Sequence, residues 1–138
     1  MKRLITYGAL MLIPFLFGFS TINTNATLAD EIVGTYTGMF AKDGELNKEF
    51  QVRVTKLSDD VILIEPLDGI SSQQVKAKIR EDNLSAIRVI RLEPVGDVVL
   101  KNGMMTPVNG RLSYGLSSKD GLKLEVFSGI RGNRSIDK

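Results

Sequence analysis

The chain has 138 residues, enough for one domain with a modest core, and it contains neither cysteine nor histidine. Without them it has no disulfide, no Cys–His or Ser–His catalytic pair and no conventional zinc site. A formal net charge of +2 gives no general attraction to nucleic acid. We therefore expect a protein that is not an enzyme, holds no metal or cofactor and does not bind nucleic acid.

The first segment has the three parts of a secretory signal peptide. Lys2 and Arg3 precede a nearly unbroken apolar run over 4–19, and a polar tract of small residues follows. Small residues stand at the third and first positions before two candidate cuts, after Ala26 and after Ala29. The alternative is an uncleaved membrane anchor, but the run is shorter than the roughly 20 residues that span a bilayer.

We therefore divide the chain into a signal peptide, 1–29, and one exported domain, 30–138. All 16 acidic residues lie in this domain, and Lys2 and Arg3 are the only two of the 18 basic residues outside it. The mature domain is thus neutral. We expect it in the periplasm or outside the cell, with no membrane span after cleavage.

The domain reads as short apolar–polar alternations separated by turn residues, which is typical of antiparallel strands. The segment 84–92 also fits a short helix face, and its β-branched content favours a strand. Asn102-Gly103 is expected to end a strand, with an irregular segment after it. The predicted strands are 34–42, 48–56, 61–65, 75–80, 84–92, 97–101 and the two strands of a hairpin within 110–132.

The last hairpin has the strongest local signal, because period-2 alternation flanks an Asp-Gly turn. We expect its two strands to share one apolar face that other strands must cover. That face is predicted to hold Leu112, Tyr114 and Leu116 on one strand and Leu122, Leu124 and Val126 on the other.

Eight strands with short connections favour an all-β, up-and-down antiparallel meander. Such a meander closes into a small barrel that is filled by side chains or holds one small ligand. Closure also removes the exposed edges that a disulfide-free exported sheet must otherwise protect. We predict the barrel, with a β-sandwich as the competing architecture.

A family resemblance follows from both ends of the meander. Gly34 and Tyr36 open the first strand as Gly-x-Tyr, and Phe127 and Gly129 close the last as Phe-x-Gly before Arg131. This pattern resembles lipocalin-like, calycin-type barrels, in which an arginine near the end of the chain packs over the tryptophan of Gly-x-Trp. The resemblance implies that Tyr36 and Arg131 take these two places. The chain lacks the tryptophan, the customary cysteines and an evident C-terminal helix, and it is short, which argues against a large ligand cavity. Small secreted bacterial proteins of unassigned function share the pattern.

Arg88 is the first candidate for ligand binding, because it shares a strand face with Ile90 and Leu92. If that face points inward, Arg88 is a cation in an apolar chamber and can bind the carboxylate of a fatty acid. If Ile87 and Val89 point inward instead, Arg88 is solvated.

Methionines and aromatic residues complete the candidate site. Met104 and Met105 are expected in a loop, either as an adaptable lid over a cavity or packed onto the core. The aromatic residues form the core, or line a pocket if the barrel is not filled. The predicted ligand-binding residues are Arg88, Tyr36, Phe40, Tyr114, Met104 and Met105.

The basic strand with Lys76, Lys78 and Arg80 suits either an anionic surface or a solvated outer face, and we favour the second. The function predicted first is the binding of a small hydrophobic ligand or lipid. The alternative is a protein-interaction or inhibitor module with a filled barrel, whose partner the sequence does not identify.

Overall fold

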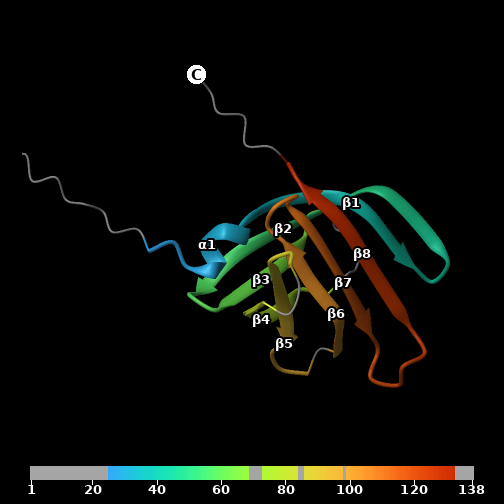
Figure 1. Cartoon of the computed structure of the whole chain (residues 1–138). Coiled ribbons are helices and arrows are strands. Elements are labelled where there is room, and N and C mark those ends of the chain that lie inside the picture. Colours follow the sequence, from blue (N-terminus) through green and yellow to red (C-terminus); the bar gives the residue numbers. More distant parts are fainter. Residues whose placement is uncertain (1–24, 69–72, 84–85, 98, 133–138) are drawn as a thin grey trace, which may run out of the picture.

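A computed structural model describes residues 25–68, 73–83, 86–97 and 99–132, so most of the predicted signal peptide lies outside the described residues. A short helix precedes eight strands (Figure 1). The elements are α1 (Leu28–Ile32), β1 (Gly34–Lys42), β2 (Glu45–Ser58), β3 (Val61–Pro66), β4 (Val75–Asp82), β5 (Val89–Pro94), β6 (Val99–Thr106), β7 (Arg111–Ser117) and β8 (Leu124–Arg131).

The eight strands form a closed antiparallel barrel in sequence order, which confirms the predicted meander and excludes the sandwich. Seven residue pairs join β1 to β8, from Tyr36 with Arg131 to Lys42 with Glu125. Among the described residues, β5 pairs with β6 over three residues only.

The β1–β2 hairpin shows how a local signal fixes an element boundary. Asp43 and Gly44 connect the strands with φ angles of 49° and 81°. A two-residue type I′ turn, whose twist matches that of the flanking strands, requires positive φ angles at both residues. Asp-Gly is among its favoured sequences. The predicted strand 34–42 therefore ends where β1 ends.

Strands β5 and β6 differ most from the prediction in extent, and β2 is longer than predicted at both ends. Strand β5 begins at Val89, and residues 86–88 before it are neither helix nor strand, while residues 84–85 lie outside the described part. Strand β6 does not end at Asn102-Gly103. The pairing with β7 shifts between Lys101 and Met104, where Asn102 has a φ of 50°, so these residues form a bulge inside a longer strand.

The predicted inward face of β8 was wrong. Phe127 is fully buried opposite Tyr114, whereas Leu122, Leu124 and Val126 are 85%, 53% and 40% exposed. In a strand, a change of one residue in register moves every side chain to the other face. The aromatic ring of Phe127 takes the inward position, and the aliphatic residues therefore face outward.

Aromatic side chains fill the centre of the barrel. The Phe40 and Phe50 rings stack with centroids 4.2 Å apart, and Phe127 lies 6.1 Å from Phe50 and 5.4 Å from Tyr114. Among the described residues, the buried side chains are all hydrophobic. The core thus consists of the chain's own side chains.

Glycine is required where β1 and β8 meet at Gly38 and Gly129. A Cβ atom on Gly38 would lie 2.1 Å from the Ser128 carbonyl oxygen and 2.2 Å from the Gly129 Cα. No shift of a flexible side chain relieves such contacts, because both atoms belong to the backbone. Strands β1 and β8 can therefore pair at this level of the barrel only if position 38 of β1 is glycine.

The inward face of β8 can be tested with a pair of substitutions. We expect Phe127→Ala to lower the free energy of unfolding by roughly 3–5 kcal/mol, because it removes a fully buried ring. Leu124→Ser, three residues away on the outer face, is expected to change it by less than about 0.5 kcal/mol. Urea denaturation measures both, and a larger loss from Leu124→Ser would contradict the register.

Candidate functional site

Helix α1 closes one end of the barrel (Figure 1). A five-residue helix is marginal by itself, so its stability must come from its cap and its packing. Thr27 and Asp30 form a capping box, in which the Thr27 N–H donates to Asp30 Oδ2 at 2.9 Å and Thr27 Oγ1 accepts from the Asp30 N–H. Ala29 and Ile32 are buried in the core. We call Thr27 and α1 together the plug.

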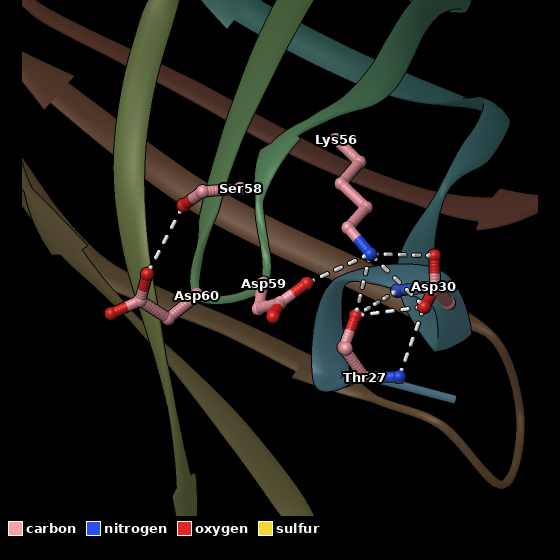
Figure 2. Close-up of polar contacts among 6 residues, drawn as sticks. All are labelled: Thr27, Asp30, Lys56, Ser58, Asp59 and Asp60. Atoms are coloured by element: carbon pink, nitrogen blue, oxygen red, sulfur yellow. Dashed lines mark hydrogen bonds and ion pairs between the residues drawn. The ribbon is translucent and has the colours of Figure 1, made fainter. Parts of the chain in front are cut away.

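Lys56 ties the N-terminal end of the plug to β2, as Figure 2 shows. Its Nζ donates to Thr27 Oγ1 at 3.0 Å and to Asp30 Oδ1 at 3.1 Å, and it pairs with Asp59 at 3.1 Å. The Thr27 backbone N–H, the Thr27 hydroxyl and Lys56 together hold the pKa of Asp30 below its usual value. Asp60 points the other way and accepts from the Ser58 hydroxyl at 3.1 Å.

The C-terminal end of the plug is bound by the residues of the family resemblance. The Tyr36 hydroxyl donates to the Ile32 carbonyl at 2.7 Å, and Arg131 Nη1 donates to the Glu31 carbonyl at 2.5 Å. The last carbonyls of a helix have no hydrogen-bond donor within the helix. The Tyr36 and Arg131 side chains therefore donate the hydrogen bonds that these two carbonyls of α1 need. Burial raises the pKa of Tyr36.

Gly34 gives Arg131 room to reach the plug. Its φ is +148°, and a Cβ atom there would lie 3.0 Å from Arg131 Cδ. Tyr36 and Arg131 are also cross-strand partners. Gly-x-Tyr and the late arginine therefore form one connection between the barrel closure and α1.

Arg88 lies at this same end of the barrel. Its Nη1 donates to Glu31 Oε2 at 2.5 Å and its Nε donates to Glu81 Oε1 at 2.7 Å. The hydrogen bond from Arg88 lowers the pKa of Glu81. The predicted inward face is present at Ile90 and Leu92, which are buried, but Arg88 precedes β5 and is 38% exposed. The geometry gives Arg88 a structural role at the plug, and its role toward a carboxylate ligand stays a prediction.

The opposite end of the barrel, which we call the mouth, holds an open cavity of about 490 Å³. Phe40 and Phe50, both buried, form its apolar bottom. Leu46, which is half exposed, and Lys42 lie at its sides. The hydrophobic surface that is open to solvent at this cavity therefore belongs mainly to Leu46.

An ion pair points into the mouth beside this cavity. Lys42 and Glu125 are cross-strand partners on the inward side of β1 and β8, with Lys42 Nζ 2.8 Å from Glu125 Oε1. The pair raises the pKa of Lys42. Burial and the charge of Glu125 raise the pKa of Tyr114, which lies one layer deeper.

The second carboxylate oxygen of Glu125 is the least satisfied atom of the mouth. Oε2 is buried and has no hydrogen-bond partner within the described part of the chain. Glu125 and Leu116 line a second cavity of about 230 Å³, and Lys42 borders both cavities. The mouth thus combines an apolar bottom with a carboxylate oxygen that can accept a hydrogen bond.

The predicted ligand-binding residues lie in different parts of the barrel. Phe40 lines the mouth and Tyr114 lies below it, whereas Tyr36 and Arg88 belong to the plug end. Met104 and Met105 are strand residues of β6 rather than loop residues. Met105 is buried in the core and Met104 is exposed on the outer face.

Sequence reasoning missed Lys42, Leu46 and Glu125 as site residues. A signal for Glu125 was present, because it stands two residues before Phe127 and therefore shares its face. Assigning the inward face of β8 to the aliphatic residues placed Glu125 outside. Across the described ranges, no group of three or more acidic side chains that could hold a metal ion occurs.

The comparisons with known proteins add no family. The chain matches no protein-family model, no curated protein and no solved structure. No helix within residues 25–132, as far as they are described, is long and apolar enough to cross a membrane. The candidate site therefore rests on the barrel geometry alone.

The plug should make stability depend on acid pH. Because the folded-state pKa of Asp30 is lowered, its stabilisation is present above its ordinary pKa of 3.8 and is lost as pH falls through the folded value. Glu81 acts in the same direction. We expect the melting temperature to fall as pH drops from about 5 to about 3, and Asp30→Asn to flatten that fall.

Thermal unfolding followed by far-UV circular dichroism at several pH values measures this effect. Glu49→Gln, an exposed change on β2, is the matched control and should leave the profile unchanged. Equal profiles for Asp30→Asn and the unsubstituted protein would show that the capping box and Lys56 do not stabilise the fold.

Proposed function

We propose that the chain is an exported, non-enzymatic barrel protein that binds a small hydrophobic ligand or lipid at the barrel mouth. The barrel shape agrees with the lipocalin-like resemblance, and the signal-peptide pattern supports export. The observation that carries the proposal is the buried Oε2 of Glu125, without a partner in the described residues, beside the cavity over Phe40 and Phe50.

The position of the ligand follows from what occupies the rest of the barrel. The centre holds stacked and tilted aromatic rings, and the far end has α1 and an open cavity of about 400 Å³ beside Asp30 and Arg131, whose lining is mostly polar. The mouth has open cavities of about 490 and 230 Å³ that share Lys42. We therefore place the ligand across the mouth, not deep inside the barrel.

The chemistry of the mouth favours an apolar chain that carries at least one hydrogen-bond donor. Contact with Leu46 would contribute about 25 cal/mol for each Å² of apolar surface removed from water, whereas Phe40 and Phe50 have little exposed surface to lose. A buried acceptor without a partner costs about 1–3 kcal/mol, and a ligand hydroxyl or amine would remove that cost at Glu125. Monoacylglycerols and long-chain amines have this combination.

Binding of 1-monooleoylglycerol to the mature domain tests the proposal. We expect Glu125→Gln and Leu46→Ser each to weaken it by roughly tenfold, because one removes the charged acceptor and the other an apolar wall. Titration followed by native mass spectrometry measures the affinities, and oleic acid serves as the ligand without the hydroxyl donors.

Arg88→Gln is the matched control at the other end of the barrel. We expect it to lower the melting temperature while leaving the affinity unchanged. A loss of binding in folded Arg88→Gln, with binding unchanged in Glu125→Gln, would contradict ligand binding at the mouth. It would favour Arg88 as the ligand-binding residue instead.

A second candidate function is favoured by the outer surface of the barrel. Exposed apolar side chains gather on the outside of β8 and its neighbours, while β4 presents Lys76, Lys78 and Arg80. Exposed apolar residues that gather on neighbouring strands are typical of protein-binding faces. We call this group the outer apolar face, and it consists of Met39, Leu124, Val126 and Ile130, with Met104 two strands away.

Chemical crosslinking in the exporting cell tests this protein-interaction function. We expect a partner band that disappears in the double variant Val126→Lys, Ile130→Lys and persists in Lys76→Glu, which changes a charged position on β4. Both substituted apolar residues are exposed, so the barrel should remain folded. An unchanged band in the double variant would contradict the outer apolar face as the docking site.

A further inference from the structure

We infer that the exported chain is cut after Ala26 and that Thr27, the new first residue, is a structural part of the mature barrel. This inference rests on the proposed export through a cleaved signal peptide. The sequence offers two cuts with the same small-residue pattern, after Ala26 and after Ala29. The two products differ in how much of the plug they keep.

The bond between Ala26 and Thr27 lies at the edge of the folded domain. Asn25 and Ala26 are exposed and belong to no helix or strand. From Thr27 onward the chain is integrated into the plug, since Leu28 packs against the core and Ala29 is fully buried. Among the described residues, a cut after Ala26 therefore removes only Asn25 and Ala26, which lie outside the barrel.

A cut after Ala29 would remove half of the plug. The product would lack the Thr27 cap, the packing of Leu28 and the buried methyl of Ala29. It would also lose the Ala29 carbonyl, which accepts from the Val33 N–H at 3.2 Å, and the Thr27 hydroxyl, which accepts from Lys56. Only three residues of α1 would remain, too few for a helical turn with its hydrogen bond.

The chemistry of the cut after Ala26 suits the contacts already in place. Hydrolysis adds one water, leaving a carboxylate on Ala26 and an amine on Thr27 that is largely protonated at neutral pH. That nitrogen lies 2.9 Å from Asp30 Oδ2. Figure 2 draws this contact as a dashed line. The cut therefore replaces the neutral amide donor to the Asp30 carboxylate by a cationic amine, and Asp30 then lies between two cations, Thr27 and Lys56.

The first test is the N-terminus of the protein purified from a secreting host. Intact mass and N-terminal sequencing should show a chain that begins at Thr27. A chain that begins at Asp30, or one that keeps its signal segment, would overturn the inference. Because ligand binding at the mouth can be measured on a domain produced without export, its failure is distinguishable from a failure here.

A substitution separates the two cuts. Ala26→Leu removes the small residue before the first cut and leaves Thr27 and Ala29 intact, so we expect the precursor to accumulate. Normal processing of Ala26→Leu would overturn the inference.

A second measurement compares two purified domains, one that begins at Thr27 and one that begins at Asp30. We expect the shorter domain to melt roughly 5–10 °C lower, because it lacks the cap and the first helical residues. Thr27→Ser, which keeps a capping hydroxyl, should melt close to the longer domain. Equal melting temperatures for the two lengths would contradict a structural role for Thr27.

Discussion

The fold depends on the hydrogen bonds that join the barrel closure to the end of α1. Tyr36 and Arg131 sit opposite each other where β1 meets β8, and they donate to the Ile32 and Glu31 carbonyls. Both carbonyls would otherwise be unsatisfied helix ends. Strand pairing and helix docking therefore support each other, which matters in a chain without disulfides.

The two ends of the barrel treat their charged residues differently. At the plug, Arg88 has both Glu31 and Glu81 as partners. At the mouth, Lys42 and Glu125 pair beside open space, and one carboxylate oxygen of Glu125 has no partner in the described residues. Charge at the plug thus supports the structure, and the proposed function assigns the Glu125 Oε2 at the mouth to a ligand.

Residues with strong turn chemistry made much of the fold predictable from the sequence. Gly34 and Asp43-Gly44 bound β1 correctly, because each supplies a backbone conformation that few residues adopt. Periodicity alone was ambiguous in β8, where Leu124 and Val126 competed with Phe127 for the core. Helix α1 was missed because it has one and a half turns, too few to show a period, and because Thr27 reads as part of the signal-peptide tract.

The unequal pairing of neighbouring strands has a consequence for how the barrel opens. Strands β1 and β8 share seven residue pairs, whereas β5 and β6 share three among the described residues, next to the bulge at Asn102. Local opening begins where the fewest backbone hydrogen bonds must break. The seam between β5 and β6 is therefore where we expect the barrel wall to separate first, away from the β1–β8 closure.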